Sequence, residues 1–174
     1  MLIPEPILAN LRRRGKAATI PAAAFEPRAV FAGNTIQVPD GDGLYLSLTA
    51  GSVHVRLFGV DAPEWGQAYA KGAWLLLSRL TLKKKITCSH IANDKYGRLV
   101  CEIFPDDGTL PALELLNAGL AWHSSMYAPH RDDYATAQAI ARMYRRGIWS
   151  ENNPMPPWRF RRIKKSCLSL TSSK

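Results

Sequence analysis

The chain has 174 residues, a length that suits one domain with its own hydrophobic core and requires no disulfide framework. Its 3 cysteines show no Cys/His spacing typical of zinc sites, so we do not expect a structural zinc. The formal net charge of +9 favours a polyanionic partner. No apolar run approaches the roughly 20 residues of a membrane-spanning helix, which predicts a soluble protein with no membrane contact.

The excess charge lies at the two ends of the sequence. Residues 34–157 balance at 12 cations and 12 acids, whereas both flanking segments are basic. We therefore expect a basic, partly disordered N-terminal extension over residues 1–33, a folded domain over 34–162 and a basic C-terminal tail over 163–174. No export signal is visible, so we expect a cytoplasmic protein as written; another export route or a misassigned start stays open.

Hydrophobic alternation predicts strands at "TIQV" (35–38), "LYLSL" (44–48) and "SVHVRLFGV" (52–60), followed by a helix over 67–81. Two further strands, "KITCSHI" (85–91) and "RLVCEIF" (98–104), flank the turn "ANDKYGR". Short helices are expected at "LPALELLNAG", closed by Gly119, and over 132–146, closed by Gly147. About five short antiparallel strands with helices predict an α+β domain, and a small closed barrel would leave no exposed edges.

Cys88 and Cys101 lie almost symmetrically about the turn that joins the last two predicted strands. They could form a disulfide in an oxidising compartment or remain two small buried thiols, and both alternatives stay open.

Acidic residues gather at the ends of the predicted strands. Asp42, in "DGDG", has the parity of inward-facing leucines, and Asp61 and Glu64 follow the third strand with Pro63 between them. Converging carboxylates favour a hard divalent ion such as Ca²⁺ or Mg²⁺, although a glycine turn and a helix N-terminus would also accommodate acids. An EF-hand is excluded, because Gly51 stands where the loop needs its final glutamate.

Two arginines complete the candidate site. Arg56 lies on the third strand and Arg98 closes the turn "DKYGR". A guanidinium matches two phosphate oxygens, so arginines beside a metal suggest phosphoryl chemistry, although exposed strand arginines are common. Arg56 and Asp61 differ in strand parity, so a bulge or the end of the strand near Gly59 must bring them together.

Five segments, "VPDGDGLYL", "VRLFGVDAPE", "NDKYGR", "LLNAGLAW" and "RGIWSENN", occur in an order and at intervals that resemble the staphylococcal nuclease (thermonuclease) family. The resemblance covers about residues 34–162, including the closing "PPWRFRR". It implies a five-stranded OB-fold β-barrel with three helices. It also implies a Ca²⁺-dependent phosphodiesterase that cleaves DNA and RNA, single-stranded or denatured, to 3′-phosphates, and we expect a monomer.

The same resemblance implies roles for individual residues. Asp42, Asp61 and the backbone carbonyl of Ala62 would be calcium ligands. Glu64 would position or deprotonate the attacking water, with Arg56 and Arg98 holding the phosphate. The remaining predicted contacts, to neighbouring phosphate and base, would come from Lys95, Tyr96 and Tyr127.

The sequence departs from the family pattern at three places. Gly43 and Ala62 stand where threonine is usual or frequent, and Ser124 replaces a common aromatic residue, which weakens the expected base stacking. His123 could compensate, or it could be structural. The alternative function is a catalytically silent OB-fold module that binds nucleic acid or protein. A third possibility is a barrel that binds a small ligand, but no feature of the sequence supports it.

Overall fold

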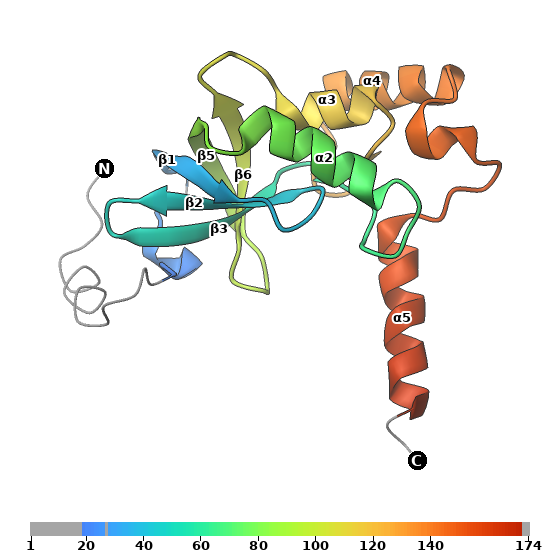
Figure 1. Cartoon of the computed structure of the whole chain (residues 1–174), viewed down its shortest axis with the longest axis horizontal. Coiled ribbons are helices and arrows are strands. Elements are labelled where there is room, and N and C mark those ends of the chain that lie inside the picture. The colour runs from blue at the N-terminus through green and yellow to red at the C-terminus, as the bar shows by residue number, and fades with distance from the viewer. Residues whose placement is uncertain (1–18, 27, 172–174) are drawn as a thin grey trace.

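A computed structural model describes residues 19–26 and 28–171 of the chain, with side chains described as far as residue 167. Five strands form a closed barrel in the order β1-β2-β3-β6-β5 (Figure 1). They are β1 (Val30–Gln37), β2 (Gly43–Leu48), β3 (Gly51–Leu57), β5 (Lys85–Asn93) and β6 (Leu99–Pro105). Two short strands, β4 (Val60–Asp61) and β7 (Trp122–His123), pair separately.

Alternate residues of the strands point into the barrel and form its hydrophobic core. Leu44 and Leu46 on β2 and Val53 and Val55 on β3 have no exposed surface. Each pair lies on one face of its strand, as a period of two requires. The predicted α+β class and five-stranded barrel are confirmed.

One strand pairing differs from the sequence prediction. All strands were expected to be antiparallel, but β3 and β6 pair in parallel, with Arg56 opposite Val100. These strands are far apart in sequence, and local alternation carries no information about which distant strands become neighbours. The parallel pairing brings the end of β3 beside the start of β6, where the turn carrying Arg98 also lies.

The barrel begins earlier than the alternation indicated. β1 starts at Val30, and a 3₁₀-helix, η1 (Ala22–Ala24), precedes it. Ile20 and Phe25 are buried in the core. Residues 19–26 and 28–33 of the expected extension therefore pack as part of the barrel domain, while residues 1–18 lie outside the described residues.

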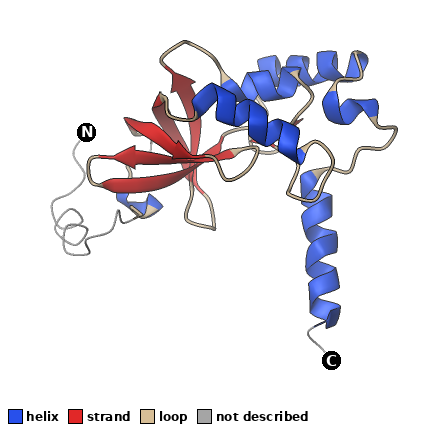
Figure 2. Ribbon diagram, in the orientation of Figure 1, coloured by secondary structure: helices blue, strands red, loops and turns tan. Residues whose placement is uncertain are grey.

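Helices α2 (Ala70–Thr81), α3 (Pro111–Asn117) and α4 (Asp132–Met143) lie together at one end of the barrel (Figure 2). A second 3₁₀-helix, η2 (Gly147–Ser150), follows α4. α2 starts later than predicted because Tyr69 adopts a left-handed conformation with φ 65°. The helix expected over 132–146 ends at Met143, and Arg145 is likewise left-handed. None of the described helices is both long and apolar enough to cross a membrane.

A fourth α-helix, α5 (Pro157–Thr171), points away from the rest of the fold (Figure 1). The sequence predicts three helices and a domain boundary at residue 162, but this fourth helix runs continuously across that boundary. Its first turn is held at the body of the protein, since Pro157 is buried and Trp158 meets Trp122 edge-on with ring centroids 6.4 Å apart.

Candidate active site

A cleft of about 890 Å³ opens at one end of the barrel. All nine predicted site residues line it: Asp42, Arg56, Asp61, Ala62, Glu64, Lys95, Tyr96, Arg98 and Tyr127. They come from the loop before β2, from β3, from β4 and the segment that follows it, from the β5–β6 turn and from the loop after β7. The cleft thus brings together predicted residues that span 86 positions of the sequence, from 42 to 127.

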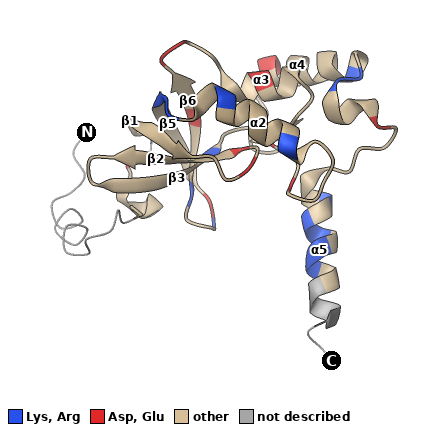
Figure 3. Ribbon diagram, viewed as in Figure 1, with Lys and Arg blue, Asp and Glu red and all other residues tan. Residues whose placement is uncertain are grey.

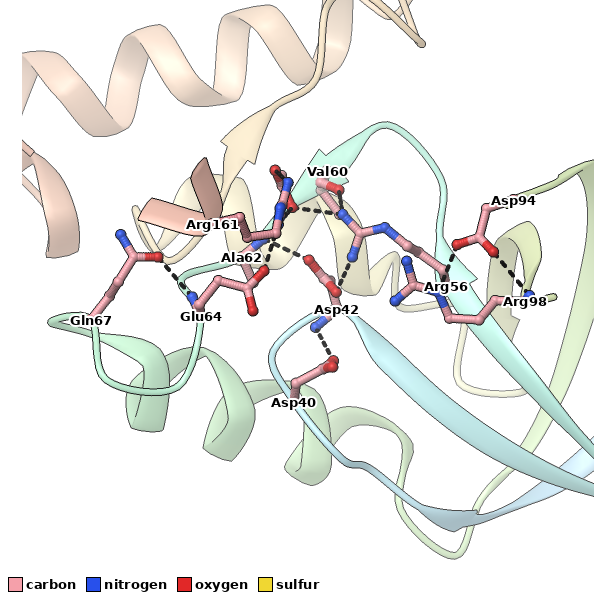
Figure 4. A network of polar contacts seen from close by, with 11 residues as sticks. Asp40, Asp42, Arg56, Val60, Ala62, Glu64, Gln67, Asp94, Arg98 and Arg161 are labelled. Carbon is pink, nitrogen blue, oxygen red and sulfur yellow. Dashed lines mark hydrogen bonds and ion pairs between the residues drawn. The ribbon is translucent and has the colours of Figure 1, made fainter. Parts of the chain in front are cut away.

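Arg56 joins the two predicted metal-ligating aspartates. Its Nη1 donates to Asp42 and its Nη2 donates to Asp61 Oδ1 at 2.7 Å (Figure 4). Both aspartate side chains are only 7% exposed and that of Arg56 is 17% exposed. Burial alone would lower the pKa of Arg56, but the charges of Asp42 and Asp61 outweigh it and raise this pKa. The guanidinium therefore stays charged in a largely dry site.

The parity conflict between Arg56 and Asp61 is resolved by the end of the strand, as predicted. β3 ends at Leu57, and Gly59 turns the chain with φ 73° before β4 begins. A Cβ at Gly59 would lie 2.9 Å from the Tyr134 ring, so both the backbone conformation and the space favour glycine. The turn aims Asp61 back at the guanidinium carried by the preceding strand.

The "DGDG" loop is held against the turn that follows β4. The backbone N–H of Ala62 donates to Asp42 Oδ2 at 2.7 Å, and the N–H of Asp42 donates to Asp40 Oδ1 at 3.2 Å. A Cβ at Gly41 would lie 2.7 Å from the side chains of Ala62 and Ala73, which explains the need for glycine there. The side chain of Asp42 is thus fixed by one backbone and one guanidinium donor.

Arg161 of α5 is a site residue that the sequence analysis did not single out. Its Nη2 donates to Asp61 Oδ2 at 2.8 Å, its Nη1 donates to Asp61 Oδ1 at 3.1 Å, and Nη1 also contacts Glu64 (Figure 4). The hydrogen bonds that Arg161 donates to Asp61 are the largest influence on its pKa and raise it; burial opposes them, and the hydrogen bond to Glu64 raises the pKa further. The basic run "WRFRRIKK" was the available signal, but it did not indicate which cation turns inward.

Glu64 lies at the mouth of the cleft with 38% of its side chain exposed. Its backbone N–H donates to Gln67 Oε1 at 2.9 Å, and Gln67 Nε2 in turn donates to the carbonyl of Met155. The turn after Pro63 is therefore tied to the segment that leads into α5. This places the carboxylate beside, and outside, the pair formed by Asp42 and Asp61.

Arg98 lies in the same cleft but is held by a residue that the sequence analysis missed. Its Nε donates to Asp94 Oδ2 at 2.7 Å, and the N–H groups of Tyr96 and Arg98 both donate to Asp94 Oδ1. Burial would raise the pKa of Asp94, but these hydrogen bonds outweigh it and lower that pKa. The position of Asp94 in the turn "NDKYGR" could have indicated this role, since the side chain of an aspartate in a turn often accepts hydrogen bonds from nearby backbone N–H groups.

Aromatic and basic side chains form the rim of the cleft. Tyr96 and Tyr127 are 70% and 74% exposed, and Lys95 Nζ lies 5.2 Å from the centre of the Tyr96 ring. Ser124 also lines the cleft, where the family pattern has an aromatic residue. His123 lies outside it, and its Nε2 contacts the carbonyl of Ala128 at 2.9 Å, a structural contact.

His54 is a third cleft residue that was not predicted. Its ring stacks on Tyr45 with centroids 4.3 Å apart, and its Nε2 is buried without a hydrogen-bond partner in the described structure. Burial, with a further contribution from Arg98, lowers the pKa of His54. The imidazole is therefore neutral at neutral pH.

Cys88 and Cys101 are both fully buried and both free, which favours the thiol alternative in this structure. Contact with Cys101 and burial raise the pKa of the Cys88 thiol. These thiols belong to the barrel core and are not among the residues that line the cleft.

The oxygen atoms of the site are suitable ligands for a hard cation, but their arrangement meets only part of what such an ion needs. Asp42 and Asp61 offer carboxylate oxygens on either side of one guanidinium, and the Ala62 backbone lies beside them. Oxygen donors of this kind suit Ca²⁺ or Mg²⁺. Arg56 and Arg161 face three carboxylates, which leaves one negative charge uncompensated. Within residues 19–26 and 28–171, no group of three or more acidic, His or Cys side chains is arranged to hold a metal.

Comparison with known proteins gives a consistent set of matches. A family model described as "Staphylococcal nuclease homologue" matches residues 54–151. An "Uncharacterized endonuclease" of Escherichia coli is 31% identical over 134 residues, covering 76% of this chain and 86% of the relative. A "Micrococcal nuclease" of Shigella flexneri is 31% identical over 147 residues, covering 79% and 84%. An "Uncharacterized endonuclease" of Haemophilus influenzae is 33% identical over 132 residues, covering 75% and 72%.

Proposed function

The chain belongs to the staphylococcal nuclease family, and we propose that it is a calcium-dependent, sugar-nonspecific nuclease that hydrolyses DNA and RNA to 3′-phosphate products. The observation that carries the proposal is the gathering of Asp42, Asp61 and Glu64 with Arg56 and Arg98 in one cleft. Carboxylates can hold a metal ion, and guanidinium groups can stabilise the charge that develops on a phosphoryl group. Denatured, single-stranded nucleic acid is the proposed preferred substrate.

The proposed calcium ligands are the carboxylates of Asp42 and Asp61 and the carbonyl of Ala62. A bound calcium ion would polarise a phosphoryl oxygen and offset negative charge that develops on it. The protein would hold these donors in place through Arg56, because its two nitrogens fix the spacing between the carboxylates. The support for this assignment is the chemistry of the donors and their burial.

The proposed general base is Glu64. Its carboxylate is partly exposed and is held at the cleft mouth by a turn that Gln67 ties down. It would take a proton from a water molecule whose oxygen attacks phosphorus, while the bond from phosphorus to the 5′ oxygen breaks and that oxygen takes a proton from solvent. Positioned carboxylates of this kind contribute about 10²–10⁴-fold to a rate.

Arg56 and Arg98 would act on the phosphate in different ways. Both terminal nitrogens of Arg56 already bind carboxylates, so Arg56 would contribute mainly its positive charge, whereas Arg98 binds Asp94 through its Nε, which leaves its terminal nitrogens as candidate phosphate donors. A guanidinium fork suits two phosphate oxygens. Lys95, Tyr96 and Tyr127 at the rim would contact neighbouring phosphate and base.

The proposal is tested by digesting heat-denatured DNA and RNA with the purified 174-residue chain, in calcium, in magnesium and in a chelator. We expect cleavage of both polymers with calcium, none with chelator, and 3′-phosphate ends by end-group analysis. Calcium titration by calorimetry provides a second readout, in which Asp42→Asn should weaken binding. Nucleic-acid binding without cleavage in any metal would instead favour the silent OB-fold module.

A further inference from the structure

Helix α5 connects the cleft to a basic surface outside it. Its cations are Arg159, Arg161, Arg162, Lys164 and Lys165, all exposed, and its described residues include no acid. Figure 3 shows this basic stretch on the part of α5 that follows its attachment to the body. Because Arg161 reaches Asp61 and Glu64, the basic surface begins inside the candidate active site.

The helix period sorts these cations into faces. Residues three and four positions apart share one face, so Lys164 and Lys165 lie on the same side as Arg161. Arg159, two positions before Arg161, lies on nearly the opposite side. From Arg161 to Lys165 the helix rises about 6 Å, so the two lysines lie close enough together to contact neighbouring phosphates of one strand.

The start of α5 is fixed relative to the cleft. Trp158 packs edge-on against Trp122, and Phe160 lies beside Gly66, where an added Cβ would be 3.6 Å from the ring. Gln67 Nε2 donates to the carbonyl of Met155 at 2.7 Å. These contacts orient the first turn, so the face that carries Arg161 continues outward from the cleft mouth at Glu64.

We propose that α5 is a nucleic-acid-binding arm, in which Lys164 and Lys165, on the face that continues outward from Arg161, hold phosphates of the strand as it leaves the cleft beside Glu64. This inference rests on the proposed nuclease function and extends it to a second contact region. The arm binds the phosphodiester backbone, which is shared by DNA and RNA, through charge and without reading the bases. It therefore favours substrates long enough to reach beyond the cleft.

The test measures binding of the full chain to labelled single strands in chelator, where cleavage is not expected. Strands of about 4 and about 16 nucleotides, the range of site sizes for one OB-fold, are compared across salt concentrations, as DNA and as RNA. For Lys164→Gln/Lys165→Gln we expect the salt slope for the longer strands to fall by about 1.4, since each phosphate contact contributes about 0.7. Binding of the shorter strands should stay unchanged.

Two controls separate the arm from total charge. Lys83→Gln/Lys85→Gln removes the same charge at the far end of β5, and Arg159→Gln removes one cation from the other side of α5. Both should leave the slope as in the wild type. The arm proposal is wrong if the salt slope falls equally in Lys83→Gln/Lys85→Gln, or if it is unchanged in Lys164→Gln/Lys165→Gln. Cleavage by the wild type would still support the nuclease proposal in either case. If the wild type neither binds nor cleaves any strand, both proposals fail.

Discussion

Arg161 and Asp61 face each other with both terminal nitrogens of the guanidinium within 3.1 Å of the two carboxylate oxygens, although 100 positions separate them in the sequence. Asp61 also accepts from Arg56 at 2.7 Å, so two guanidinium groups share one carboxylate. A proposed calcium ligand is therefore already engaged by an internal cation, and calcium must compete with the positive charge of Arg161 for the same oxygens.

Arg161→Gln should therefore tighten calcium binding. The side chain of Arg161 is 44% exposed, so solvent screens its charge, and we expect a gain of roughly five- to ten-fold in affinity, about 1 kcal/mol. Isothermal titration calorimetry with calcium alone measures this. Arg159→Gln, on the other side of the same helix, should bind as the wild type does. Unchanged or weaker binding in Arg161→Gln would show that this arginine does not oppose the cation.

Glu64→Gln should lower the rate of cleavage by about 10²- to 10⁴-fold, because the amide keeps the shape of the side chain but cannot accept a proton from water. Arg98→Ala should cost about 10²- to 10³-fold, as expected for the loss of one charge-stabilising donor. Initial rates of release of acid-soluble nucleotides measure both. Glu151→Gln, an exposed site in the loop after η2, serves as the control and should keep the full rate. Full activity in both site variants would contradict the assignment.

Arg56→Met should destabilise the fold by about 3 kcal/mol, because it leaves Asp42 and Asp61 buried without their shared partner. Urea denaturation measures the free energy of unfolding. Arg79→Met, at an exposed position of α2, should change it by no more than about 0.5 kcal/mol. If calcium binds these carboxylates, it should stabilise Arg56→Met more than the wild type. A variant as stable as the wild type in chelator would mean that the ion pairs contribute nothing.

The strands and the site motifs were predictable because their signals are local. Alternation placed Leu44 and Leu46 inside the barrel, and the same parity placed Asp42 with them. The need for a turn near Gly59 followed from geometry alone, since Arg56 and Asp61 could not otherwise meet. Family motifs supplied the remaining predicted site residues, and the structure brings them into one cleft.

The features that escaped prediction depend on distant parts of the chain. Charge counting identified a basic tail, but the contact of Arg161 with Asp61 depends on how α5 is seated by Trp158. The parallel pairing of β3 with β6 is a property of the whole barrel and leaves no periodic trace. Tyr69 carries no residue-type signal for its left-handed conformation, so the start of α2 was placed too early.

The pH dependence of stability provides a test of the surroundings of His54 in the cleft. Burial and Arg98, with Arg56, lower the pKa of His54, while Asp94 and Asp42 act in the opposite direction. The unfolded chain therefore binds a proton at a higher pH than the folded protein does. The stability contributed by the neutral imidazole is present above the unfolded pKa of about 6.5 and is lost as the pH falls below it.

His54→Phe keeps a ring to stack on Tyr45 and removes this titration. The free energy of unfolding, measured by urea denaturation, should then fall less between about pH 7.5 and about pH 5 in the variant than in the wild type. His130→Gln, at an exposed position before α4, should follow the wild-type curve. Parallel curves for His54→Phe and the wild type would show that the imidazole is protonated equally in the folded and unfolded states, and that His54 is more hydrated than its packing indicates.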